Sequence, residues 1–238
     1  LAEYEIQIYE KLGDSQKAGR AYEMYYKKDV QQSENRKQTE VKRLKKRIEL
    51  QKEINKRADI EARKIMLVSQ SEQDELTKIY NRRGIKRHVG AKFKETQQLQ
   101  KSFSIAIVDV DYFKEYNDTY GHPAGDNILQ TIAQILEESV SKAGIVGRYG
   151  GDEFLIAIAQ RNSEEVEQII CCIREKLKQK AIKNRRSTVS EYVTVSIGAV
   201  NVVPERKTLL SEYIHAADHA LYEIKKTSKN GFLVLSSF

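Results

Sequence analysis

The sequence predicts an α+β domain, a mixed sheet covered by helices on one face, that follows a long helical segment. Two observations in the 238 residues support this prediction. Residues 29–72 contain neither glycine nor proline and are dense in Lys, Arg, Glu and Gln, which favours one long helix. From Asp74 onward, strand-length apolar runs and helical periods follow one another in the order β, α, β, β, α, β.

The α+β part begins with a helical period at about 81–99 and a buried strand at 103–109. A helix over 124–141 leads to a hairpin, whose strands at 145–149 and 153–159 flank Gly150-Gly151. The remaining predicted elements are a helix over about 166–177, a polar loop at 184–190, a strand at 192–200, a helix at about 209–226 and a strand at about 231–235.

Residues 1–28 are predicted to form two short amphipathic helices around a turn at Gly13-Asp14. Their run of small and aromatic residues resembles the end of a tetratricopeptide repeat, and any helical hairpin is the alternative interpretation. One repeat cannot bury its own face, so we expect further repeats upstream. The first residue, Leu1 rather than Met, agrees with a fragment of a longer protein.

The long helix of residues 29–72 carries apolar residues at alternating three- and four-residue steps, as in a coiled coil. We therefore expect a parallel homodimer through this segment, with a lone solvated helix as the alternative. Leu50 and Ile54 fall outside the seam and allow a second register. The seam residues are Val41, Leu44, Ile48, Gln51, Asn55, Ala58, Ala62 and Ile65.

The net charge of +7 lies mainly in residues 1–70, which hold 17 Lys and Arg against 12 Asp and Glu. A nucleic-acid-binding coiled coil is a weak alternative, because glutamates are interleaved and no aromatic platform accompanies the basic cluster at 42–47. No apolar stretch approaches about 18 residues, so we expect no membrane span in this fragment. The adjacent Cys171 and Cys172 cannot easily pair, which favours a reducing, cytoplasmic setting.

Two acidic motifs predict the site of chemistry. Asp109 and Asp111 end a fully apolar strand and alternate onto the same side, and Asp152 and Glu153 directly follow a double-glycine turn. If these strands are neighbours, up to four carboxylates meet at one sheet edge. Such oxygen ligands select a hard cation such as Mg²⁺, which suits phosphoryl or nucleotidyl transfer.

Five motifs in this order resemble the GGDEF domain of the diguanylate cyclase family, over about residues 72–235. The resemblance implies a palm-like fold, similar to ferredoxin-like and nucleotidyl-cyclase sheets, within a domain of residues 73–238. It also implies condensation of two GTP to cyclic di-GMP and two pyrophosphates between two facing domains. The motifs are "DELTKIYNRRG" (74–84), "VDVDYFKEYNDTYGHPAGD" (108–126), "RYGGDEF" (148–154), "VSIGA" (195–199) and "ADHALYEIKK" (217–226).

The same resemblance assigns roles at the metal site, which would hold two Mg²⁺ ions, with Mn²⁺ as a substitute. Asp109 would bind metal through its carboxylate and Val110 through its backbone carbonyl. Asp152 would be the second ligand and the base for the attacking 3′-hydroxyl. Glu153 would assist with metal and catalysis, or else be a structural carboxylate of the turn.

For the nucleotide, Asn117 and Asp126 would hydrogen-bond the guanine edge, which favours GTP over ATP. His122 either lines the pocket or is a structural loop residue. The backbone amides of Phe113 and Lys114 would cradle phosphate oxygens. The side chains of Lys114, also a catalytic candidate, and Lys225 would bind the triphosphate, each with a solvated surface lysine as its alternative.

Three departures from the family pattern stand out. Residues 141–144 read Ser-Lys-Ala-Gly where the family's inhibitory Arg-x-x-Asp lies, so we expect little product inhibition through that site. Lys229 and Gly231 occupy positions where arginine is frequent, and Lys78 replaces a common glycine with little expected effect.

The leading prediction is thus a cytoplasmic cyclase regulated by upstream helical repeats that bind a protein or peptide. It has GTP as substrate, forms a homodimer, and binds neither nucleic acid nor membrane in this fragment. The alternative is a catalytically silent GTP-binding module that signals through protein interaction.

Overall fold

The computed structural model describes residues 2–13, 15–70, 72–141 and 144–237, without the side chains of residues 2, 3 and 62–70. The chain divides into two units, residues 1–66 and 67–238. None of the helices in the described ranges has the length and apolar character needed to cross a membrane.

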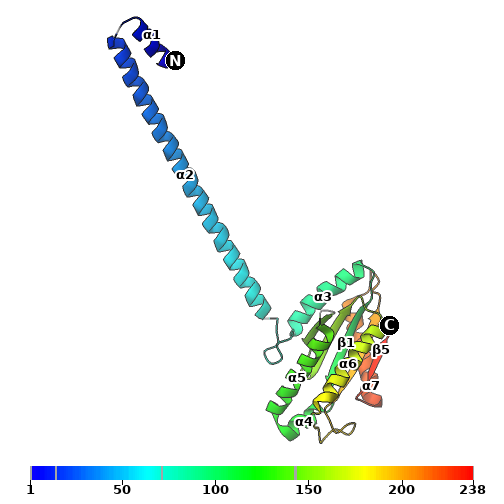
Figure 1. The fold of residues 1–238 in the computed structure, drawn as a ribbon. Helices are drawn as coiled ribbons and strands as arrows, with labels where there is room; N and C mark the ends of the chain where they lie inside the picture. Colours follow the sequence, from blue (N-terminus) through cyan, green and yellow to red (C-terminus); the bar gives the residue numbers. More distant parts are fainter. Residues whose placement is uncertain (1, 14, 71, 142–143, 238) are drawn as a thin grey trace. The chain divides into compact units, whose positions relative to one another are not determined.

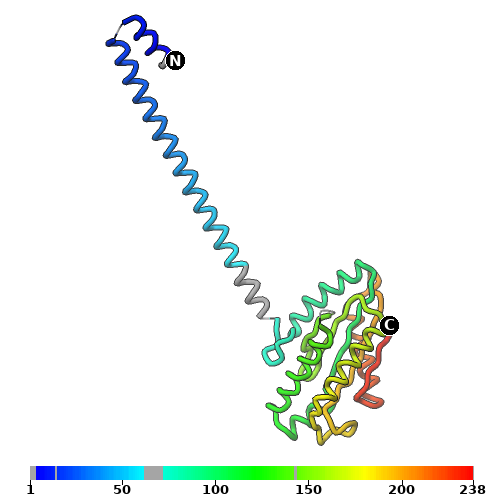
Figure 2. The backbone as a smooth tube through the Cα atoms, in the orientation of Figure 1, coloured from blue at the N-terminus to red at the C-terminus, as the bar shows by residue number. Residues whose placement is uncertain are grey.

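The first unit holds helix α1 (Ala2–Lys11) and most of helix α2 (Ser15–Gln70). Figure 2 shows α1 folded back beside the start of α2. Ile6 and Ala18 are buried, and the Tyr22 hydroxyl donates to a carboxylate oxygen of Glu10 at 3.2 Å. Two helices lie on either side of Gly13, and Asp14 of the predicted turn lies outside the described residues. The second helix does not end near residue 28. Because no glycine or proline interrupts the chain there, α2 continues for 56 residues.

The seam predicted on α2 is exposed along its described length. Val41, Leu44 and Ile48 each keep about half of their surface accessible, at 49%, 53% and 55%. Ala62 and Ile65 lie outside the described side chains. An exposed apolar row at these steps is typical of a helix that pairs in a coiled coil. The dimer stays a prediction, as does the tetratricopeptide-like character of the hairpin.

The second unit is an α+β domain built on one five-stranded mixed sheet, which confirms the predicted fold class (Figure 1). The strand order is β2-β3-β1-β4-β5, with antiparallel neighbours throughout except for the parallel pair β4 and β5. The elements are α3 (Arg82–Gln98), β1 (Phe103–Val110), α4 (Phe113–Tyr120), α5 (His122–Val140), β2 (Gly144–Arg148), β3 (Glu153–Ala159), α6 (Ser163–Lys180), β4 (Val195–Val202), α7 (Leu210–Thr227) and β5 (Phe232–Leu235).

Helices cover both faces of this sheet, so the expectation of a single covered face is wrong. Ala106 and Val108 of β1 pack into a core with α5 and α6, whereas Ile105 and Ile107 pack against α3 and α7. Every residue of β1 is buried. The physical reason is visible in the sequence, because a strand covered on both faces is a continuous apolar run.

Helix α7 approaches β4 closely at Gly198. A Cβ atom there would lie 2.6 Å from Leu221 Cα and would also meet the Leu221 nitrogen and the Ala217 oxygen. These are backbone atoms and cannot rotate away. The absent side chain therefore sets the distance between α7 and the sheet.

We expect Gly198→Ala to lower the free energy of unfolding by about 3 kcal/mol, because α7 must move off the sheet. Gly90→Ala on α3 is the matched control, since a Cβ there meets nothing within 4 Å. That change should stabilise the domain by up to about 1 kcal/mol. Urea denaturation of both variants measures the difference, and equal effects would contradict the close approach.

Candidate active site

Three of the four acidic residues of the two predicted motifs meet where β1 ends beside β3. The antiparallel register places Asp109 opposite Glu153, and the Val110 amide donates to the Asp152 carbonyl at 3.4 Å. Asp152 and Glu153 are half-buried, and Asp109 is 7% exposed. The structure thus confirms that the two strands are neighbours and that three of the four carboxylates share one edge.

The double-glycine turn makes room for one of these carboxylates. A Cβ on Gly150 would lie 2.7 Å from a carboxylate oxygen of Glu153. The amides of Tyr149 and Gly150 donate to the Glu153 carbonyl at 2.8 and 3.2 Å, which closes the turn. A side chain at Gly150 would therefore push the Glu153 carboxylate group away from its present position.

The fourth carboxylate, Asp111, does not join the cluster. It is 1% exposed and lies just beyond the end of β1. Its oxygens accept hydrogen bonds from Thr194 Oγ1 and Ser196 Oγ, both at 2.7 Å, and from the Asn230 amide at 3.0 Å. With three donors, this carboxylate fixes β4 and the segment after α7, and the predicted set of four reduces to three.

Lys225 reaches the cluster from α7. Its Nζ lies 2.6 Å from Asp109 Oδ2, so it contacts a carboxylate rather than standing free for a phosphate. Burial raises the pKa of Asp109 to about 6; the Lys225 ammonium opposes this rise, and the charges of Asp152 and Glu153 add to it. A carboxylate among like charges favours a bound cation.

The donor set fits a hard divalent cation. Carboxylate oxygens from Asp109, Asp152 and Glu153, with the nearby Val110 carbonyl, are the ligand types that Mg²⁺ prefers. Among the described residues, no three His, Cys, Asp or Glu side chains already converge as a metal-binding group. The Lys225 ammonium instead supplies the positive charge at Asp109.

The predicted guanine-binding residues lie together at the corner between α4 and α5. Asn117 Oδ1 is buried and has no hydrogen-bond partner. Gly125 packs directly against this oxygen, because a Cβ there would clash with it and would lie 2.9 Å from Asn117 Cγ. The next residue, Asp126, is exposed. A buried acceptor without a donor beside a free carboxylate can receive N–H groups of a ligand.

The other predicted nucleotide contacts surround this corner. His122 begins α5 and is exposed, and its role in the pocket and its structural alternative both stay predictions. Phe113 and Lys114 open α4, whose first-turn amides lack partners within the helix, and the Lys114 side chain is exposed. Lys229, at a departure from the family pattern, places its Nζ 4.7 Å from the ring centre of Tyr112. Lys142 and Ala143 of the altered inhibitory motif lie outside the described residues.

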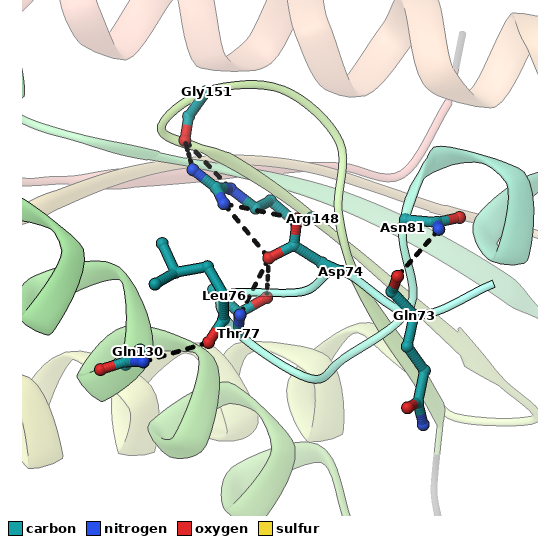
Figure 3. Close-up of polar contacts among 8 residues, drawn as sticks. All are labelled: Gln73, Asp74, Leu76, Thr77, Asn81, Gln130, Arg148 and Gly151. Atoms are coloured by element: carbon teal, nitrogen blue, oxygen red, sulfur yellow. Dashed lines mark hydrogen bonds and ion pairs between the residues drawn. The ribbon is translucent and has the colours of Figure 1, made fainter. Parts of the chain in front are cut away.

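The sequence did not reveal how the signature turn is held. Figure 3 shows the Arg148 guanidinium between the turn and the opening motif. Its Nε and Nη2 donate to the Gly151 carbonyl at 3.1 and 2.7 Å, and Nη1 donates to Asp74 Oδ1 at 3.1 Å. Both side chains are largely buried. The only available signal was that Asp74 and Arg148 stand in the first and third motifs, 74 residues apart.

The opening motif folds into a tight turn around Asp74. Asp74 Oδ1 accepts hydrogen bonds from the Thr77 amide and hydroxyl at 2.9 and 2.7 Å. Burial alone would raise the pKa of Asp74, but the bonds from Thr77 and Arg148 outweigh it and hold this pKa below its usual value. Gln130 Nε2 donates to the Leu76 carbonyl at 3.1 Å and fastens the turn to α5 (Figure 3).

Lys78, at a common glycine position of this motif, has a φ of 63°. A left-handed backbone costs a side-chain-bearing residue about 1 kcal/mol relative to glycine. The replacement therefore carries a local strain, whereas the sequence suggested little effect.

The fold and this site define an α+β domain with an acidic centre suited to phosphoryl chemistry at a cation. The model of the family "Diguanylate cyclase, GGDEF domain" matches residues 71–231. The chain therefore belongs to the GGDEF family and carries a diguanylate cyclase domain.

Individual relatives agree with this assignment. The chain is 33% identical over 162 residues to "Probable diguanylate cyclase DgcT" of Escherichia coli K12, covering 68% of this chain and 35% of that protein. It is 36% identical over 162 residues to the diguanylate cyclase DosC of the same strain, covering 66% and 34%. The chain thus spans about a third of the length of these relatives.

A solved structure extends the similarity to the helical unit. The diguanylate cyclase SiaD of Pseudomonas aeruginosa, in complex with its activator SiaC, matches with a TM-score of 0.72 and 26% identity. The match covers 98% of this chain and 88% of that one.

The raised pKa of Asp109 predicts a pH-dependent cost in metal-free protein. Between the ordinary pKa of 3.8 and about 6, the folded state binds more protons than the unfolded state, so stability falls as pH rises. Between pH 4 and pH 7 the free energy of unfolding of the wild type should fall by about 2 kcal/mol relative to that of Asp109→Asn. Urea denaturation with chelator measures this shift, and a pH-independent difference would contradict it.

Removal of the Asp74 charge should weaken the turn that holds Arg148. We expect Asp74→Asn to lower the free energy of unfolding by about 2 kcal/mol at pH 7, because it leaves a largely buried guanidinium without its counter-ion. Folding lowers the pKa of Asp74. The stability that the Asp74 carboxylate contributes is therefore present above about pH 4 and is lost in stronger acid. Glu75→Gln makes the same change at the exposed neighbouring residue and should have no measurable effect.

Proposed function

We propose that this protein condenses two GTP molecules to cyclic di-GMP with release of two pyrophosphates. The observation that supports this most directly is the register of β1 with β3, which brings Asp109, Asp152 and Glu153 to one edge. In each half-reaction a ribose 3′-oxygen forms a bond to the α-phosphorus of the other GTP. The bond from that phosphorus to the β-phosphate bridge oxygen breaks, and pyrophosphate leaves.

The chain's own groups supply a base and charge. Asp152 would accept the proton of the attacking 3′-hydroxyl, while Glu153 stays close enough to Asp109 to raise its pKa. Lys225 would turn from Asp109 toward the triphosphate, with Lys114 and the first-turn amides of α4 at the phosphate end. Two Mg²⁺ ions, or Mn²⁺ in their place, would be held by Asp109, Val110, Asp152 and Glu153 and would offset the phosphate charge.

Guanine selection would rest on the corner between α4 and α5. The unpaired Asn117 Oδ1 and the exposed Asp126 carboxylate are acceptors for the N1–H and the exocyclic amine of guanine. Adenine does not offer these two donors together. His122 would lie at the rim of the same pocket.

Catalysis would require a homodimer, because each domain holds one GTP and the reaction joins two. The exposed seam of α2 supplies the surface for a parallel coiled coil. The similarity to SiaD, solved with its activator, supports regulation by a protein or peptide at the helical unit. A cytoplasmic location, favoured by two free neighbouring cysteines, completes the proposal.

One observation favours a second candidate, a silent GTP-binding module. The Lys225 ammonium lies 2.6 Å from Asp109 and holds a carboxylate that a catalytic cation would need. If this ion pair survives nucleotide binding, the domain would signal through interaction alone. Assays of binding and turnover on the same sample separate the two candidates.

Incubation of the chain with GTP and Mg²⁺ should yield cyclic di-GMP on chromatography. Asp152→Ala should lower the rate by roughly 10³-fold or more, because it removes both the base and a metal ligand. Asp118→Ala, an exposed acid on α4, is the matched control and should retain activity. GTP binding without product from a demonstrated dimer would establish the silent module instead.

The seam predicts which leucines support the dimer. Leu44→Glu should give monomers by light scattering and abolish cyclase activity, because it places a charge in the apolar row. Leu50→Glu, equally exposed on the same helix but outside the main seam, should keep both. The opposite result would show that the second register, through Leu50 and Ile54, is the one in use.

A further inference from the structure

A cavity lies outside the acidic centre, between α6 and the segment of residues 190–195. Its volume is about 310 Å³. Cys171, Arg174 and Lys178 line it from α6, and Ser190 and Tyr192 line it from the opposite segment. None of Asp109, Asp152 and Glu153 takes part, so the cavity is separate from the proposed GTP site.

The Arg174 guanidinium forms part of the cavity wall. Its Nη2 donates to the Asn230 carbonyl at 2.7 Å, and its central carbon lies 5.6 Å from the ring centre of Phe232. These contacts fix the plane of the fork. Arg174 Nε is buried and has no hydrogen-bond partner, and no carboxylate forms an ion pair with Arg174 among residues 72–141 and 144–237.

A buried donor on an uncompensated cation is unfavourable unless something else satisfies it. The rest of the lining holds one ammonium and one carboxylate, those of Lys178 and Glu175, so Arg174 leaves the cavity with one net positive charge. Lys178 contacts Glu175 only at 3.9 Å, with both side chains mostly exposed, so this pair is weak in water. Hydroxyl groups of Ser190 and Tyr192 add donors of the kind that bind oxyanions.

We propose that this cavity binds a small phosphate-bearing anion, with Arg174 as its principal ligand. A guanidinium presents parallel N–H groups that match two oxygens of a phosphate, and a fixed fork loses little freedom on binding. The volume admits an inorganic phosphate, a pyrophosphate or the phosphate of a nucleoside monophosphate, and these share the chemistry that Arg174 recognises.

The site also has a short connection to the end of β1. The Asn230 carbonyl accepts a hydrogen bond from Arg174. The Asn230 backbone amide donates a hydrogen bond to an Asp111 carboxylate oxygen at 3.0 Å. Thr194, another residue of the cavity wall, donates to the same Asp111 oxygen. An anion bound to Arg174 would therefore affect the hydrogen bonds that hold Asp111, two residues after Asp109.

The two adjacent cysteines provide a local readout. Cys171 lines the cavity, whereas Cys172 points toward α5, with its Sγ 4.0 Å from Ser139 Oγ. Both are free and exposed. The reaction rate of each thiol with an alkylating reagent is measured in the full chain, with the other cysteine replaced by serine, at constant ionic strength. The probes are inorganic phosphate, pyrophosphate and GMP in separate titrations.

At tenfold excess over the dissociation constant, the anion should slow alkylation of Cys171 about tenfold and leave Cys172 unchanged. The probe that protects Cys171 at the lowest concentration identifies the source of the phosphate. Arg174→Gln should abolish protection. Lys178→Gln should weaken it, and Lys180→Gln, the same change outside the cavity wall, should not.

Equal slowing of both cysteines, or protection of Cys171 that persists in Arg174→Gln and Lys178→Gln, would overturn the proposal. If Arg174→Gln does not fold, the pair of lysine variants decides by itself. Protection should persist in Asp152→Ala, because the readout needs no turnover. The anion site and the cyclase proposal can therefore fail independently.

Discussion

The pairing of β1 with β3 is the interaction on which the rest of the domain depends. β1 is the central strand, hydrogen-bonded on both sides and buried on both faces. Its register brings the end of one strand against the start of the next, so Asp109 meets Asp152 and Glu153. Apolar burial along β1 and β3 supplies the free energy that holds these like charges together. A shift by one residue would turn Asp109 to the other face.

The other half of the site depends on how α7 meets the sheet. Gly198 lets the backbone of α7 approach β4, and Lys225 lies one turn beyond Leu221, which contacts this glycine. The Lys225 ammonium reaches Asp109 because α7 lies close to β4. Burial is the main cause of the raised pKa of Asp109, and the charges of Asp152 and Glu153 add to it. Three acids at one edge have one ammonium among them, and this unequal balance explains the fit to a further cation.

Much of this architecture could be predicted from the sequence, because strands and amphipathic helices leave local periodic signals. The carboxylate edge followed from two motifs and one assumption, that their strands are neighbours. The second helical layer was missed although β1 is apolar throughout, since periodicity does not reveal which helix covers which face. The Arg148 clamp on Asp74 and Gly151 was missed for another reason. It joins residues 74 positions apart through geometry that only the folded chain defines.

Asp109 and Asp111 show why residue type and spacing do not by themselves assign a role. They stand two residues apart on one strand end, and alternation places them on the same side. Asp111 lies beyond the strand, where Thr194, Ser196 and Asn230 supply neutral donors and satisfy its charge. Asp109 remains within the ladder, where its neighbours are other acids and one ammonium. The groups around each carboxylate, rather than the motif that contains it, decide its role. Asp111 stabilises the fold, and Asp109 is a candidate metal ligand.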